Sequence, residues 1–206
     1  MAKEELIETI VKLEWDAFDK VDNLGGRADC QDDWNTFSIM RKSQYLTWPE
    51  DLIASFIMDF KEANEKGWNL ITEKYGRMME STSPAEYDAI KEQLPECSEK
   101  KRAIVDQIVQ IQVEWMEEFA KEYPYMAGNS RSIHASEDTP YNTSYETYLR
   151  GELLTYSNRT LGMYGQWIVT LKQVEKNLAK MIMTNTALLY GYGSLEAAET
   201  ALEKQG

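Results

Sequence analysis

The sequence contains few of the residues on which most catalytic sites depend. It has one histidine, His134, and two cysteines, Cys30 and Cys97, without a CxxC pair. Carboxylate-bridged di-metal centres in helical bundles take a Glu-x-x-His motif from each of two helices, so a single histidine argues against such a centre. The acidic neighbours of Cys30 disfavour its thiolate form. We therefore predict no metal site, assign no cofactor, treat Cys30 as structural and expect Cys97 at the surface or in a linker.

Positive charge and long apolar runs are also scarce. The chain has 22 basic and 35 acidic residues, which gives a formal net charge of −13. Such a charge repels phosphate backbones and anionic lipids, so nucleic acid and membranes are unfavourable partners. No apolar run approaches the ~20 residues of a membrane span, and the chain opens on an amphipathic pattern without a signal-peptide core. Together with the low cysteine content, these features predict a cytoplasmic protein.

Sustained strand alternation is absent, and helical periodicity extends over nearly all of the chain. Caps and helix breakers divide this pattern into segments. The predicted helices cover 3–22, ended by Gly25 and Gly26; 34–45, capped by Asp33; 50–79; a short stretch after Ser83; 98–124; and a segment capped by Thr143 with Glu146. The sequence thus predicts an all-α fold, and its length suits a single domain over residues 1–206.

The second half of the chain repeats the pattern of the first. A shift of 98 positions aligns the apolar positions of the first helix with those of the helix after Ser98, and a shift of 108 aligns residues 37–48 with 145–156. This predicts a helical bundle of two similar repeats, about 1–97 and 98–206, related by a pseudo-twofold axis. Chance agreement is the alternative, because a shared helical period alone makes apolar positions coincide.

Two glutamates interrupt the most apolar helical faces of the chain. Glu14 lies at the centre of an apolar arc that includes Ile10, Val11 and Phe18, and Glu152 lies among aromatic and aliphatic residues on the equivalent of the second helix. Burying an ionised carboxylate is expensive unless it is paired. Each glutamate therefore needs a partner, a function or both.

Polar side chains on the neighbouring helices supply these partners. If the repeats pack about the pseudo-twofold axis, Glu14, Arg41 and Gln44 face Gln112 and Glu152 across an aromatic centre. One interpretation is a buried ion-pair network, in which Arg41 bridges the carboxylates and fixes the register of the helices. The other is a small-molecule pocket, because such pockets combine aromatic walls with a few convergent polar groups.

The pocket interpretation gives each group a role. Glu14 and Glu152 are the candidate catalytic residues, acting as acid and base or holding an amine, because desolvation raises carboxylate pKa values. Arg41 would bind a ligand anion, and Gln44 and Gln112 would orient the ligand. The other candidate ligand-binding residues are the aromatic walls and one loop arginine: Trp34, Trp48, Tyr145, Tyr148, Tyr156 and Arg27.

Five sequence strings spread over the chain carry a family resemblance. They are GGRADCQDDW at 25–34, MRKSQ at 40–44, VEW at 113–115, EDTPY at 137–141 and YLRGELL at 148–154. With these strings the chain resembles a bacterial family catalogued only as a domain of unknown function, over essentially its whole length. The resemblance implies a bacterial, intracellular, single-domain protein without an established activity. It assigns no catalytic or binding residue to this chain.

We interpret the chain as a small-molecule-binding protein, and as an enzyme if Glu14 and Glu152 exchange protons with the ligand. The alternative is a structural or protein-interaction domain whose buried polar cluster only fixes helix register. The first interpretation requires space beside polar groups, whereas the second requires a solid centre. The sequence assigns no substrate and no oligomeric state.

Overall fold

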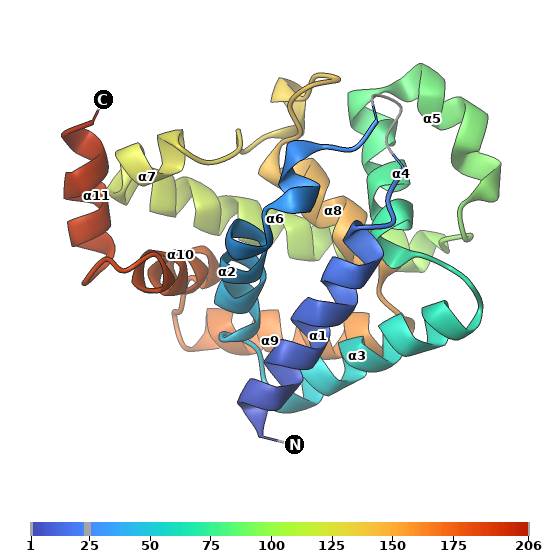
Figure 1. Cartoon of the computed structure of the whole chain (residues 1–206), viewed down its shortest axis with the longest axis horizontal. Helices are drawn as coiled ribbons and strands as arrows, with labels where there is room; N and C mark the ends of the chain where they lie inside the picture. The colour runs from blue at the N-terminus through green and yellow to red at the C-terminus, as the bar shows by residue number, and fades with distance from the viewer. Residues whose placement is uncertain (1, 23–25, 206) are drawn as a thin grey trace.

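The computed structural model describes residues 2–22 and 26–205, and these residues form eleven α-helices without a strand (Figure 1). This confirms the predicted all-α fold. The helices are α1 (Lys3–Phe18), α2 (Trp34–Tyr45), α3 (Glu50–Glu65), α4 (Leu70–Thr82), α5 (Pro84–Ile90), α6 (Glu99–Glu122), α7 (Pro124–Gly128), α8 (Tyr145–Thr155), α9 (Asn158–Gln173), α10 (Leu178–Leu189) and α11 (Leu195–Glu203). Short 3₁₀ turns cover Asp29–Asp32, Lys91–Gln93 and Ala135–Glu137.

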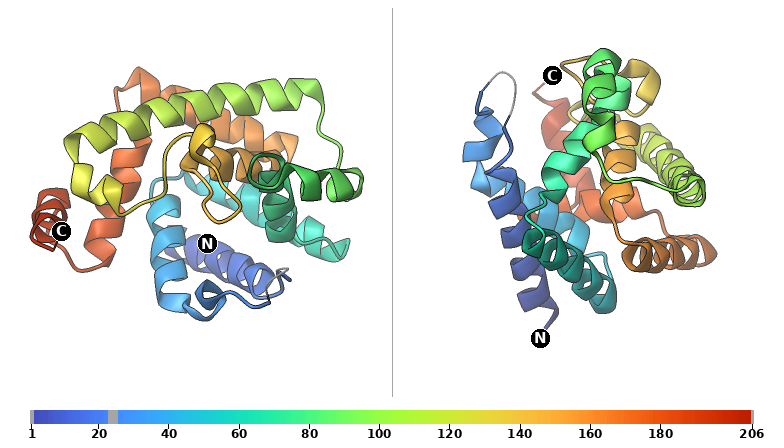
Figure 2. Two further views of the ribbon diagram at one scale, coloured as in Figure 1. Left: turned by 90° about the horizontal axis from the view of Figure 1, so that it is seen from above. Right: turned by 90° about the vertical axis from the view of Figure 1, so that its right-hand side faces the viewer.

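Helices from both halves of the chain enclose one aromatic core. The long helix α6 crosses the molecule and packs on α8, α9 and α10, while α11 lies at the edge beside α7 (Figures 1 and 2). The largest fully buried side chains include Tyr45 and Trp48 of the first half and Tyr156 and Tyr164 of the second. Their rings meet at centroid distances of 5.0 to 6.2 Å, which suits edge-on and tilted aromatic packing.

The segment predicted as one helix over 50–79 is two helices, so that prediction was wrong. The chain turns at Gly67, which has a φ of +67° that favours glycine. Asn69 then caps α4, because its side-chain oxygen accepts hydrogen bonds from the amides of Ile71 and Thr72. This turn places α4 against α8, and Lys74 on α4 reaches the centre of the molecule as a result.

The helix caps agree with the sequence at two ends and differ at a third. Asp33 caps α2 and Ser98 caps α6 through their side-chain oxygens, as predicted. The predicted Thr143 cap of α8 was wrong, because Ser144 accepts from the amide of Thr147 instead. The first helix ends at Phe18 rather than near residue 22, and Gly25 of the predicted stop lies outside the described residues.

Equivalent contacts recur in the two halves at the predicted shifts. Helix α4 packs on α8, and α10, its counterpart in the second half, packs on α2. The caps of α4 and α10 are Asn69 and Asn177, 108 positions apart. Their side-chain amides donate to the carbonyls of Ala17 and Trp115, 98 positions apart. These matched contacts support the predicted duplication about a pseudo-twofold axis, which remains a proposal.

Candidate functional site

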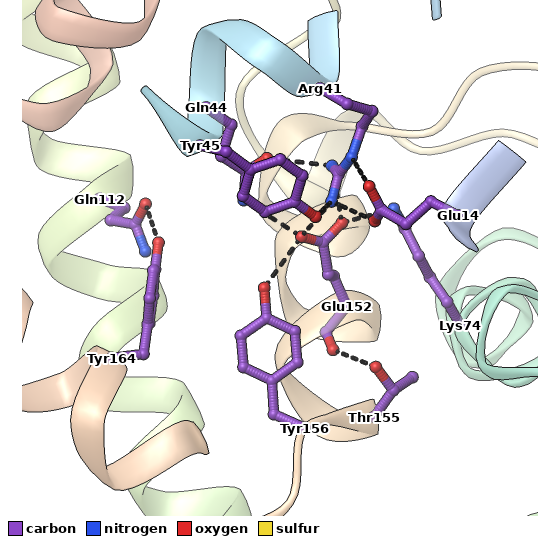
Figure 3. Close-up of polar contacts among 10 residues, drawn as sticks. All are labelled: Glu14, Arg41, Gln44, Tyr45, Lys74, Gln112, Glu152, Thr155, Tyr156 and Tyr164. Atoms are coloured by element: carbon purple, nitrogen blue, oxygen red, sulfur yellow. Dashed lines mark hydrogen bonds and ion pairs between the residues drawn. The ribbon is translucent and has the colours of Figure 1, made fainter. Parts of the chain in front are cut away.

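Arg41 on α2 is the centre of a buried ionic cluster (Figure 3). Its Nε donates to Glu14 Oε2 at 2.8 Å and its Nη2 to Glu14 Oε1 at 2.5 Å, which is the bidentate geometry that a guanidinium offers to a carboxylate. Nη1 donates to Gln44 Oε1 at 3.0 Å, and Nη2 also reaches the hydroxyl of Tyr45 at 2.7 Å. Arg41 therefore joins α1 to α2 in an apolar interior.

Glu152 on α8 completes the cluster from the other half of the chain. Its carboxylate accepts from Nη1 and Nη2 of Arg41, both at 3.2 Å, and from Lys74 Nζ at 2.6 Å. The Gln44 amide and the Tyr156 hydroxyl donate to Oε1 at 3.2 and 3.0 Å. We call Glu14, Arg41, Lys74 and Glu152, with Gln44, Tyr45 and Tyr156, the charged network.

The charged network is balanced in charge and closed in hydrogen bonding. Two carboxylates meet two cations, and all four charged side chains are at most 9% exposed. Every nitrogen of the Arg41 guanidinium donates within the network, and both oxygens of each carboxylate accept within it. Buried ion pairs persist when their remaining hydrogen-bonding capacity is filled in this way. The arrangement therefore fixes the register of α1, α2, α4 and α8.

The net pKa shifts of the two carboxyl groups are opposite in direction. Burial raises the pKa of Glu14 above its ordinary value, because the single neighbouring cation, Arg41, does not fully offset the loss of water. Burial alone would also raise the pKa of Glu152, but Arg41 and Lys74 together outweigh it and hold that pKa well below the usual range. Glu152 is thus the more firmly ionised of the pair.

Gln112 and Tyr145, both predicted in this site, form a separate contact. The Gln112 oxygen on α6 accepts from the hydroxyls of Tyr145 at 3.3 Å and Tyr164 at 3.1 Å. Figure 3 shows Gln112 turned towards Tyr164 rather than towards the charged network. Gln112 therefore does not face Glu14, contrary to the prediction.

The predicted aromatic and loop residues lie at three different places. Trp48 is fully buried beside Tyr45 and Tyr156, and so packs on the network. The ring of Tyr148 stacks with Lys74 Nζ, 3.4 Å from its centroid. Trp34 is half-exposed and packs on Trp15 and Phe37, and Arg27 is held at the surface by Asp19 and Asp32. The structure does not bring these last two residues to the network, and the ligand-binding role predicted for the whole set stays a prediction.

Lys74 is the network residue that the sequence analysis missed. It lies three and four positions from Ile71 and Met78, two buried residues of α4, which is the same signal that identified Glu14. The assumption of one long helix over 50–79 hid this signal, because the turn before Asn69 resets the helical phase. The sequence analysis did not assign Tyr45 to the site either, although its hydroxyl accepts from Arg41.

A polar cavity of about 410 Å³ lies beside the packed pair of α4 and α8. Helices α4, α6 and α8 line it, together with Ala135 from the loop before α8. Each helix contributes one pair of charged side chains to the lining: Arg77 and Glu80 of α4, Arg102 and Asp106 of α6, and Glu146 and Arg150 of α8. The other lining residues are small or apolar: Ser81, Ala135, Thr147, Gly151 and Leu154. We call this space the polar cavity.

Arg77 gives the polar cavity an unused donor. Its side chain is 3% exposed, and its Nε and Nη2 bond to Glu73, with Nη2 also donating to the carbonyl of Pro95 at 2.7 Å. Its Nη1 donates to none of the described residues. Arg77 lines the cavity and Nη1 is not among the fully buried atoms, so this nitrogen remains available to a ligand there. The sequence analysis did not identify Arg77, because only the packing of three helices assembles this cavity.

A second cavity, of about 470 Å³, lies between α3 and α9. Its lining is mainly apolar and includes Leu52, Met163 and Trp167. Arg159 is its basic residue, and the Nε of that side chain already donates to Ser55 at 2.9 Å. The polar cavity therefore offers more groups that could orient a ligand.

Gly151 allows α8 to approach α4 closely behind the polar cavity. A Cβ at this position would lie 2.8 Å from Met78 Cγ and 3.0 Å from the backbone oxygen of Lys74. We expect Gly151→Ala to lower the free energy of unfolding by about 1–3 kcal/mol in a urea titration, because overpacking displaces the helices. Gly162→Ala in α9 is the control: its Cβ meets nothing within 4 Å, so better helix propensity raises stability by up to about 1 kcal/mol. Equal effects of the two substitutions would contradict this account.

The fold and the charged network define an all-α helical protein with an ionic centre, and comparison with known sequences gives its family. Residues 4–200 match the family described as "Protein of unknown function (DUF4125)". The chain therefore belongs to that family, as the resemblance of its sequence strings predicted. No curated protein and no solved structure matches the chain.

Two further properties of the described residues bear on the kind of site. They contain no group of three or more His, Cys, Asp or Glu side chains placed to hold a metal ion. Over the same part of the chain, no helix combines the length and the apolar character needed to cross a membrane.

Proposed function

We propose that this protein binds a small molecule in the polar cavity between α4, α6 and α8. The observation that carries the proposal is Arg77, a buried arginine on the cavity wall whose Nη1 has no partner among the described residues. Arg102 and Arg150 line the same space from two other helices. A volume of about 410 Å³ falls within the range of about 300–1,000 Å³ typical of small-molecule sites.

In this proposal the charged network is the frame of the binding site. Helices α4 and α8 contribute Lys74 and Glu152 to the network, and Arg77 and Arg150 to the lining of the cavity. An ion pair between Lys74 and Glu152 thus holds the two cavity walls at a fixed spacing, and binding sites need such support to keep their donors in place. The acid–base role of Glu14 and Glu152 stays a prediction.

The chemistry of the chain supports a small-molecule ligand rather than a macromolecular polyanion. The net charge of −13 opposes binding to nucleic acid and to anionic membranes. Cys30 and Cys97 are free thiols, which supports a location in the reducing cytoplasm.

A substitution of Arg102 tests the proposal. Its side chain is 42% exposed and makes one contact, with Glu80 at 3.8 Å, so Arg102→Gln is expected to fold normally. The purified protein would be titrated by calorimetry with four probe classes: short carboxylates, inorganic phosphate, primary amines and the proteinogenic L-amino acids. We expect at least one class to bind the parent, and Arg102→Gln to weaken that binding at least about tenfold, since a charge-assisted hydrogen bond contributes about 1.5–3 kcal/mol.

Arg27→Gln is the matched control for this experiment. Arg27 is 46% exposed, close to the exposure of Arg102, and pairs with Asp19 and Asp32 away from the cavity. Its substitution is expected to leave the affinity within about twofold of the parent. Absence of binding for all four probe classes, or equal affinity of the parent and Arg102→Gln, would refute the proposal.

A structural role without a ligand is the second candidate. The hydrogen bonding of the charged network favours it, because every nitrogen of the Arg41 guanidinium and both oxygens of each carboxylate already have partners within the network. This candidate requires every probe class to fail in the titration above. Specific, saturable binding that depends on Arg102 would remove it.

A further inference from the structure

The charges around the polar cavity are balanced, and each helix contributes one of each sign. Arg77 and Glu80 come from α4, Arg102 and Asp106 from α6, and Glu146 and Arg150 from α8. A cavity for a simple anion would concentrate positive charge, as binding of carboxylate or phosphate requires. Here the three carboxylates oppose such a ligand, and the charge of −13 on the whole chain adds to that opposition.

Two of these six charged groups, Arg102 and Glu80, make no side-chain hydrogen bond among the described residues. Arg150 is engaged on both sides, because it pairs with Asp106 and, at 2.9 Å, with Glu146. Arg102 and Glu80 contact each other at 3.8 Å, beyond hydrogen-bonding distance, and their side chains are 42% and 52% exposed. A cation on α6 and an anion on α4 thus face the same space, with the free Nη1 of Arg77 beside them.

The predicted duplication supplies an internal comparison for these groups. At the shifts of 98 and 108 positions, the equivalents of Arg77, Glu80 and Arg102 are Asn185, Leu188 and Glu4. Ser43 is the equivalent of Gly151, and its carbonyl accepts from the side-chain amide of Asn185 at 3.0 Å. The Asn185 side chain is therefore bonded to the backbone of α2. The same helix packing is therefore made elsewhere in this chain without the three charges, which supports a role for them other than stability.

We propose that the ligand of the polar cavity is a small zwitterion with a carboxylate and an ammonium group a few bonds apart, as in an α-amino acid. Arg102 and the free Nη1 of Arg77 take the carboxylate, and Glu80 takes the ammonium. The inference rests on the proposed function, because it names the ligand class of the same cavity. It follows from the two opposite charges that face the cavity and contact each other only at 3.8 Å, because a ligand carrying both signs supplies a closer partner to each.

Ligand series with one charge removed test this inference. Each L-amino acid that binds would be compared by calorimetry with its deaminated acid and its decarboxylated amine, for example L-leucine with 4-methylpentanoate and 3-methylbutylamine. We expect each singly charged analogue to bind at least about tenfold more weakly than the amino acid, because it leaves one cavity charge without a partner.

Two substitutions assign the charges to their partners. Glu80→Gln is expected to abolish the preference for the amino acid over its deaminated acid, while Arg102→Gln abolishes the preference over the amine. Glu62→Gln, an exposed glutamate of α3, is the matched control for Glu80 and is expected to keep both preferences. These readouts are ratios of affinities, so a general loss of stability does not imitate them.

The outcomes separate this inference from the proposed function. Deaminated acids or phosphate that bind as tightly as the amino acids would overturn the zwitterion assignment and leave the cavity as an anion site. An unchanged preference in Glu80→Gln would overturn it as well. Failure of every probe to bind would refute the proposed function itself.

Discussion

Glu152→Gln is expected to lower the free energy of unfolding by about 3–5 kcal/mol, measured by urea denaturation at pH 7. The substitution keeps the shape of the side chain and removes its charge. Lys74 then loses the one ion-pair partner that it has among the described residues while remaining 4% exposed, and Arg41 keeps the carboxylate of Glu14. Breaking a buried ion pair from one side is expensive because the remaining charge stays buried without compensation. Most of the loss therefore comes from Lys74.

Glu80→Gln is the control for Glu152→Gln. Glu80 is 52% exposed, and its contact with Arg102 is 3.8 Å long, so the loss is expected to stay below about 1 kcal/mol. A loss of that small size in Glu152→Gln would show that the charged network does not hold the helices.

The pH dependence of the two proteins follows from the lowered pKa of Glu152. Because the pKa of this carboxyl is depressed in the folded protein, its contribution to stability is complete above the ordinary carboxyl pKa of about 4.3. That contribution decreases as the pH falls from there through the folded-state pKa. The stability difference between the parent and Glu152→Gln is therefore expected to stay constant from pH 5 to 8 and to shrink below pH 4. A difference that shrinks above pH 5 would contradict this assignment.

Sequence periodicity predicted the all-α fold and most of the charged network. Glu14, Arg41, Gln44 and Glu152 stood out because polar groups occupied apolar helical faces, and the structure brings these four together. Such positions are visible in sequence, since helical phase decides which residues face inward. Lys74 was missed because the turn before Asn69 changes the phase of α4 relative to α3.

The polar cavity was beyond the reach of sequence analysis for a different reason. Arg102 and Glu80 lie on exposed helical faces, where charged residues are ordinary and carry no signal. Only the packing of α4, α6 and α8 places them across one space. Packing between helices also decided the position of Gln112. The sequence placed this residue in the interior correctly, but the rotation of α6 directs its side chain to Tyr164 and not to the charged network.

A variant with an apolar centre is expected to recover the stability that Glu152→Gln loses. It carries Glu14→Leu, Arg41→Met, Gln44→Met, Lys74→Met and Glu152→Leu, with Tyr45→Phe and Tyr156→Phe, so that no polar side chain of the network is left without its partner. Replacing a whole buried ionic cluster by apolar groups of similar size is often neutral or stabilising by about 1–4 kcal/mol. We therefore expect this variant to be at least as stable as the parent in urea denaturation.

Restoring Glu14 alone in the apolar variant is the matched control, and it should again remove about 3–5 kcal/mol, because that carboxylate would be buried without Arg41. An apolar variant less stable than Glu152→Gln would show that the ionic contacts themselves hold the fold. The same protein also decides which site binds the ligand. If the polar cavity binds it, amino-acid affinity stays close to that of the parent, because Arg77, Glu80 and Arg102 are intact. If affinity disappears while the helical structure remains, binding depends on the ionic contacts of the charged network and not on the polar cavity alone.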